Sequence, residues 1–293
     1  MYSGSRVEDE SGQPSEWRGG RLIYNPGQIV HTRHDRRNRP IAFRGRKITD
    51  LVDTMSSLTL VRHAQASFFA EDYDQLSDQG EMQSAALGAY WLAGGRFFDE
   101  VYVGPRVRHH RTAEIVGDCY RDAGQDWPDV VSLDDFDEHH VDQLVRMEGE
   151  SLANDYPQLK PLADQFCHAG NPADKQRAFQ IFFQALADCW ITGATGDQVE
   201  SWQDFRERVN HGMDHVISAS SASGRNVAVF TSVGPITVAL QRALNCPDKA
   251  ALETGWRTWN CSLTDFAFTA ERLTLDRFNS LPHLTDSSQW TYR

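Results

Sequence analysis

The stretch Leu58-Thr59-Leu60-Val61-Arg62-His63-Ala64-Gln65-Ala66-Ser67 decides the fold of this chain. Its first four residues are apolar or β-branched, which is typical of a short buried strand. Arg62 and His63 follow at the carboxyl end, the edge at which open α/β sheets bind ligands. An arginine binds an anion through a planar fork of donors, and a neutral imidazole can attack an electrophile. The pair predicts a phosphoryl site; the alternative is a strand-end pair at the surface without a ligand.

Several segments resemble motifs of the histidine phosphatase superfamily, and they occur in that family's order. The opening run resembles Leu-Val-Arg-His-Gly, and Leu76 to Ala85 resembles Leu-Thr/Ser-x-x-Gly-x-x-Gln-Ala. Gly104 to Ala113 resembles Ser-Pro-Leu-x-Arg-Ala-x-x-Thr-Ala. The family's Leu-x-Glu falls at Leu133-Asp134-Asp135, and its closing motifs fall at 260–264 and 282–284. The resemblance spans residues 57 to 285.

The resemblance implies a phosphoglycerate-mutase-like α/β domain over residues 55–293. We expect a mixed, mainly parallel sheet with helices on both faces and a helical insertion near residues 140–222. Residues 1–54 differ, with ten Lys and Arg against seven Asp and Glu and many Gly, Ser and Pro. Such a composition buries too little apolar surface to offset the entropy of ordering, so we expect a disordered extension there.

The resemblance also implies roles for individual residues. His63 would be the nucleophile and form a phosphohistidine, while Arg62 and Arg108 would clamp the phosphoryl group. From the residues alone, Arg106 and Arg111 compete with Arg108 for this assignment.

The general acid falls by resemblance at Asp135, where the family more often has Glu. The carboxylates of Asp137 and Glu138 lie close in sequence and could serve instead. A phosphomonoester needs such an acid because its leaving oxygen must take up a proton.

One motif departs from the family pattern of Ser/Thr-His-Gly-Gly after the fourth strand. Here the strand 226–232 ends in Thr231-Ser232-Val233-Gly234, so that Ser232 occupies the histidine position. We expect Ser232 and Gly234 to bind the phosphoryl group, aided by free N–H groups of a helix that begins at Pro235. Serine brings no positive charge, and His283 is the other imidazole that could fold back to supply one.

The leading hypothesis is hydrolysis of a phosphorylated small molecule, without a cofactor or metal. The alternatives are a degenerate phosphatase that binds such a ligand without turnover, and phosphoglycerate-mutase-like transfer. His211 and His215 have the i, i+4 spacing of metal ligands, but no third ligand is evident, so we expect a solvated helix face.

Composition excludes other classes of function. The 293 residues carry a formal charge of −12, which argues against a nucleic-acid partner. No apolar run approaches the ~20 residues of a membrane helix. The five cysteines are odd in number and scattered, and the amino terminus is polar, so we expect reduced thiols and a cytoplasmic location.

Overall fold

The computed structural model describes residues 55–67, 74–140, 156–193, 199–220 and 222–292. In these ranges the chain forms one six-stranded sheet with the strand order β3-β2-β4-β1-β5-β6. The strands are β1 (Ser56–Arg62), β2 (Glu100–Val103), β3 (Val130–Ser132), β4 (Asn226–Thr231), β5 (Leu263–Phe268) and β6 (Leu273–Ser280).

Strand pairing makes the sheet mixed and mainly parallel, as the sequence predicts. β4 pairs in parallel with β1 and β2, and β2 pairs in parallel with β3. β5 runs antiparallel to β1, and β6 runs antiparallel to β5. Because β1 and β4 are parallel neighbours with Arg62 opposite Thr231, the residues that follow them, His63 and Ser232, emerge at the same edge.

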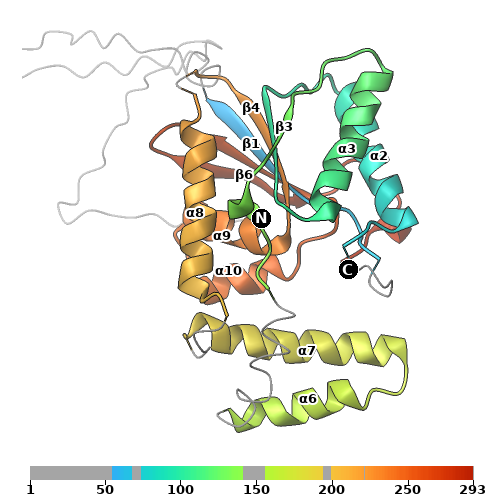
Figure 1. Cartoon of the computed structure of the whole chain (residues 1–293), viewed down its shortest axis with the longest axis vertical. Coiled ribbons are helices and arrows are strands. Elements are labelled where there is room, and N and C mark those ends of the chain that lie inside the picture. The colour runs from blue at the N-terminus through green and yellow to red at the C-terminus, as the bar shows by residue number, and fades with distance from the viewer. Residues whose placement is uncertain (1–54, 68–73, 141–155, 194–198, 221, 293) are drawn as a thin grey trace, which may run out of the picture. The chain divides into compact units, whose positions relative to one another are not determined.

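Helices cover both faces of this sheet (Figure 1). One face carries α2 (Asp78–Ala93) and α3 (Val107–Asp122), and the other carries α8 (Trp202–Ser218), α9 (Val233–Leu244) and α10 (Asp248–Gly255). The described residues also form the short 3-10 helices η1 (Asp134–Phe136), η3 (Pro157–Leu159) and η4 (Ser287–Gln289). None of the described helices is both long enough and apolar enough to cross a membrane.

Two apolar cores lie on opposite faces of the sheet, and β4 contributes to both. Val227 and Val229 pack with the α8 and α9 side chains, whereas Ala228 and Phe230 pack with those of α2 and α3. Successive strand residues point to opposite faces, so a strand buried on both sides must be apolar at nearly every position. This explains the near-continuous apolar runs of β1 and β4.

The described part of the predicted insertion is helical. α6 (Lys160–Cys167) packs on α7 (Pro172–Ile191), and α7 buries Phe182, Leu186 and Trp190 in the core that α8 also lines. Residues 141–155, 194–198 and 221 lie outside the described ranges, as do residues 1–54. The predicted domain boundaries and the disordered extension therefore stay predictions.

Leu60 on the central strand β1 tests this arrangement, because its side chain is fully buried. We expect Leu60→Ala to lower the free energy of unfolding by about 2–5 kcal/mol, from lost burial and a residual cavity. Val131→Ala in the edge strand β3, at a side chain that is 46% exposed, is the control and should change it little. Denaturant titration measures both; equal losses would contradict the assigned core.

Candidate active site

His63 follows β1 directly, and its main chain is held on both sides. Its N–H donates to the Thr231 carbonyl of β4, with an N–O distance of 2.8 Å. Its carbonyl accepts from the Cys261 N–H at 3.1 Å and from Asn260 Nδ2 at 3.3 Å. The segment before β5, which the sequence matches to a family motif, therefore helps to fix the position of His63.

The His63 imidazole is buried, and its hydrogen bonding defines the reactive nitrogen. Nδ1 lies 2.8 Å from the Ala64 carbonyl oxygen. A carbonyl only accepts, so Nδ1 carries the ring proton and Nε2 keeps its lone pair. Burial, followed by the positive charges of Arg108 and Arg62, holds the pKa of His63 well below its ordinary value. The ring is therefore neutral at pH 7, with Nε2 available as a nucleophile.

Two buried arginines, Arg62 and Arg108, carry the charges that act on this ring. An Nη1 group of Arg62 donates to the Thr258 carbonyl, which anchors the guanidinium. Arg108 lies in the first turn of α3, and its Nη2 donates to Ser232 Oγ at 3.4 Å. The Arg108 side chain therefore links the start of α3 to the residue that follows β4.

The competing arginines are engaged elsewhere. Arg106 donates from Nε to Asp137 Oδ1 at 2.5 Å. Arg111 is partly exposed and pairs with Glu81 at 2.9 Å. Of these three arginines, only Arg108 contacts Ser232 in the described residues, which favours its assignment.

Asp74 joins the site through Arg108, and the sequence gives no signal for it. Its Oδ1 accepts from Arg108 Nη1 at 2.7 Å, and its Oδ2 accepts from the Val107 N–H at 2.8 Å. A carboxylate at the first turn of a helix complements the helix dipole. Asp74 thus orients Arg108 and caps α3 from a loop 34 residues away in sequence.

His109 also lies in the site, although no role was predicted for it from the sequence. The imidazole is fully buried, and Nε2 lies 2.6 Å from Ser232 Oγ. Its ring centroid lies 5.7 Å from that of His63. Gly104 leaves room for the ring, since a Cβ there would lie 2.5 Å from His109 Nδ1. The available signal was a second Arg-His pair, Arg108-His109, which lies in the first turn of α3.

The start of α9 differs from the prediction. The helix begins at Val233 rather than Pro235, so Ser232 stands at the N-cap position, yet its side chain makes no capping bond. The Gly234 N–H, predicted to face the phosphoryl group, donates instead to Glu138 Oε1 at 3.0 Å. A carboxyl oxygen of Glu138 therefore already accepts from one N–H group of this helix start.

Asp135 lies in η1 and faces α8. Its Oδ1 lies 2.7 Å from His211 Nδ1, and this hydrogen bond raises the pKa of His211. Its Cβ lies 2.5 Å from where a Cβ at Gly212 would stand, so the side chain packs directly on α8. Its described contacts do not join it to His63 or Ser232.

The contacts given below for the remaining candidates, His211, His215 and His283, do not include His63. His211 is largely exposed, and the His215 ring meets that of Tyr102 edge-on at 6.2 Å. No cluster of three or more His, Cys, Asp or Glu that could hold a metal occurs among the described residues. The His283 ring lies 6.4 Å from that of Tyr90 on α2, and no contact in the described ranges joins it to Ser232.

The loop after His63 is braced by α2. Ser77 caps this helix by accepting from the Gly80 N–H at 3.1 Å, and Gln83 Oε1 accepts from the Gln65 N–H at 3.0 Å. A Cβ at Gly80 would lie only 2.1 Å from the Gln65 carbonyl oxygen. The Leu-Ser-x-x-Gly-x-x-Gln segment is thus explained by close backbone approach rather than by chemistry.

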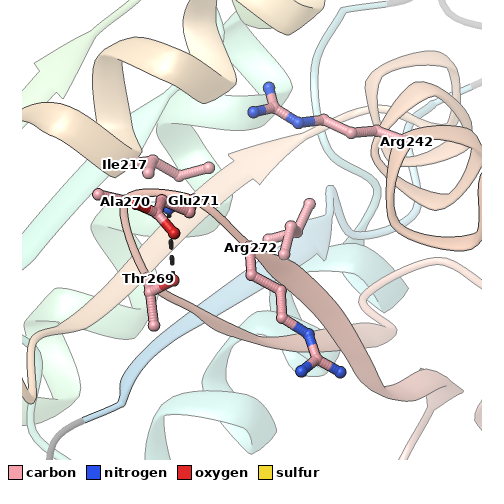
Figure 2. Close-up of a pocket in the computed structure, with 7 residues that line it drawn as sticks. Ile217, Arg242, Thr269, Ala270, Glu271 and Arg272 are labelled. Atoms are coloured by element: carbon pink, nitrogen blue, oxygen red, sulfur yellow. Dashed lines mark hydrogen bonds between the residues drawn. The ribbon is translucent and has the colours of Figure 1, made fainter.

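A pocket of about 250 Å³ lies elsewhere, between Ile217, Arg242 and the β5–β6 turn at residues 269–273 (Figure 2). Since Phe268 pairs with Ser56 at the start of β1, this turn lies at the sheet edge opposite His63. Arg242 is paired with Asp214 at 2.6 Å. The pocket is therefore separate from the site around His63.

Comparison with a family model shows which family the chain belongs to. The model for the histidine phosphatase superfamily (branch 1) matches residues 58–177 and 169–281. The chain belongs to this superfamily. The matched ranges include His63, Arg108 and Ser232. Among curated protein sequences, none matches the chain.

Solved structures share the histidine phosphatase fold with this chain. Bacillus stearothermophilus YhfR is 14% identical at a TM-score of 0.54, over 78% of this chain and 99% of its own. A phosphoglycerate mutase from Bacillus anthracis is 18% identical at 0.53, over 80% and 97%. The alpha-ribazole phosphatase from Shigella flexneri is 16% identical at 0.52, over 77% and 96%. At these identities the likeness establishes the fold, and the predicted fold class is confirmed.

Buried histidines make the stability of the protein depend on pH. Burial lowers the pKa of His283 to about 4. Below pH 6.5 the unfolded state therefore binds a proton that the folded state does not, so this histidine reduces stability as the pH falls from 6.5 towards 4. We expect His283→Gln to reduce that dependence by at most ~1.4 kcal/mol per pH unit.

The measurement is the free energy of unfolding from pH 7 to pH 4.5 in both proteins. His110→Gln, at an exposed histidine, controls for removal of an imidazole as such. An unchanged slope in His283→Gln would show that His283 has the same pKa in the folded and unfolded states.

Proposed function

We propose that this chain hydrolyses a phosphorylated small molecule through a phosphohistidine at His63. The observation that carries the proposal is the neutral ring of His63, whose Nδ1–H is held by the Ala64 carbonyl. A nucleophile must keep its lone pair, and burial together with the charges of two arginines achieves this by lowering the pKa of His63.

The reaction follows in two displacements at phosphorus. His63 Nε2 attacks, so that a P–N bond forms while the bond from phosphorus to the leaving oxygen breaks. Water then attacks the phosphohistidine and gives a proton to the carboxylate that protonated the leaving oxygen, the P–N bond breaks, and inorganic phosphate leaves. Arg62 and Arg108 stabilise the charge on the phosphoryl oxygens in both steps, because charge-assisted hydrogen bonds strengthen in a site that excludes water.

The proton for the leaving oxygen comes, in this proposal, from Glu138 rather than Asp135. Glu138 Oε1 accepts from the N–H groups of Gly234 at 3.0 Å and His139 at 3.1 Å. This leaves Oε2 for a proton, and the Gly234 N–H that holds Oε1 lies two residues after Ser232. Asp135, the residue suggested by the Leu-x-acid register, is paired with His211.

A location in the cytoplasm is part of the same proposal. The five cysteines all lie in the described ranges and are free thiols, which supports a reducing compartment such as the cytoplasm. Binding without turnover and phosphoryl transfer to a second hydroxyl remain the alternatives, and the variants below separate them.

The first test removes the nucleophile. His63→Ala should abolish both turnover of an aryl phosphate and acid-quenched phosphoenzyme, while the thermal midpoint stays nearly unchanged. His110→Ala is the matched control, because it removes an exposed imidazole from the adjacent helix. Turnover that survives in His63→Ala would end the proposal, and phosphoenzyme that forms without release of phosphate would favour transfer to another acceptor.

The second test identifies the acid by varying the leaving group. Phenolate is a poor leaving group and needs a proton, whereas 4-nitrophenolate does not. We expect Glu138→Gln to slow phenyl phosphate by about 10²–10⁴-fold and 4-nitrophenyl phosphate much less. Asp135→Asn should slow the two substrates equally. The reverse pattern would assign the acid to Asp135.

A further inference from the structure

His109 is a buried imidazole that takes no part in the two displacements above. Its Nε2 lies 2.6 Å from Ser232 Oγ, and its ring lies 5.7 Å from that of His63. Burying a polar ring costs free energy unless hydrogen bonds compensate it. Ser232 is the partner at Nε2, and the Gly104 main chain lies beside Nδ1. The question is what this hydrogen bond does for a ligand at His63.

The hydrogen-bonding capacity of Ser232 limits the possible arrangements. Its hydroxyl has one proton to donate and two lone pairs that accept. Arg108 can only donate, so Ser232 Oγ accepts from Arg108 Nη2 at 3.4 Å. One proton and one lone pair remain, to be divided between His109 Nε2 and a ligand.

The two possible divisions have opposite effects on an anion. If Ser232 donates to His109 Nε2, a lone pair faces the ligand and repels a phosphoryl oxygen. If the His109 Nε2–H donates to Ser232, the hydroxyl proton is free to be donated to the ligand. A phosphoryl oxygen without a proton only accepts, so it binds favourably in the second arrangement alone.

We propose that His109 is a positioning residue, whose Nε2–H donates to Ser232 and turns the Ser232 proton towards a phosphoryl oxygen. The inference rests on the proposed function in that the ligand is a phosphoryl group. His109 acts as a neutral ring, since burial and the charge of Arg108 hold its pKa well below the ordinary value. Ser232 and His109 together thus form one polarised donor beside two arginines.

Calorimetric titration with inorganic phosphate tests this without requiring turnover. His109→Phe keeps a flat ring but removes the donor, and Ser232→Ala removes the hydroxyl; each should weaken phosphate binding about tenfold. His109→Gln keeps an N–H donor and should lose less. His110→Phe, at the exposed neighbour on α3, is the matched control.

The double variant His109→Phe, Ser232→Ala decides whether His109 acts through Ser232. If it does, the double variant binds phosphate no more weakly than Ser232→Ala alone. Multiplied losses, or His109→Phe that binds as tightly as the unchanged protein, would overturn the inference.

A spectroscopic measurement on the unchanged protein covers the case that His109→Phe does not fold. The ¹⁵N shifts of the His109 ring, assigned by their change in Ser232→Ala, report which nitrogen carries the proton. With phosphate bound, Nε2 should be protonated and Nδ1 bare. A bare Nε2 with phosphate bound would overturn the inference.

These results separate the inference from the proposed function. Coupled losses in phosphate binding, without any phosphohistidine, keep the role of His109 and end the proposed hydrolysis. Normal turnover, together with a phosphate affinity that does not depend on His109, keeps the proposed hydrolysis and ends the role of His109. An unchanged protein that binds no phosphate overturns the role of His109, whatever its turnover.

Discussion

The parallel pairing of β1 with β4 is the constraint on which the site depends. It sets Arg62 opposite Thr231 and continues for one more hydrogen bond, from the His63 N–H to the Thr231 carbonyl at 2.8 Å. A slip of one residue would turn every side chain of β1 to the other face, exchanging the two cores. Because both faces are packed with helices, that register is strongly specified. The position of His63 beside Ser232 is thus fixed by the same apolar side chains that stabilise the sheet.

The positive charge of the site comes from the position of two arginines and not from the overall composition of the chain. The chain carries a net charge of −12, yet two buried arginines lie around His63. Asp74 pairs with Arg108, and Glu138 accepts from an N–H group at the start of α9. A phosphoryl dianion would complement the two guanidinium groups and would meet neutral imidazoles rather than cations. Burial keeps His63 neutral, which maintains its lone pair without a separate base.

The sequence predicts those features that depend on short-range pattern. Continuous apolar runs identify β1 and β4, and the Ser77 cap with Gly80 places the start of α2. The Arg-His ending of β1 points to the candidate nucleophile, and the family motifs point to Arg108. Contacts across the sheet edge could not be predicted, because Asp74, His109 and Glu138 meet their partners over 34, 123 and 96 residues. The same limit explains why the sequence could not predict the pairing of Asp135, which stands at the acid position of the Leu-x-acid motif, with His211 on α8.

The central claim is that phosphorus is attacked first by His63 and then by water. Each in-line displacement inverts the configuration at phosphorus, so two in succession restore it. The most direct measurement is therefore the stereochemical outcome with an aryl phosphorothioate that is made chiral by two oxygen isotopes and hydrolysed by the full chain in water that carries the third. The account predicts net retention at phosphorus. Net inversion would mean that water attacks the substrate directly, and it would contradict a phosphohistidine intermediate.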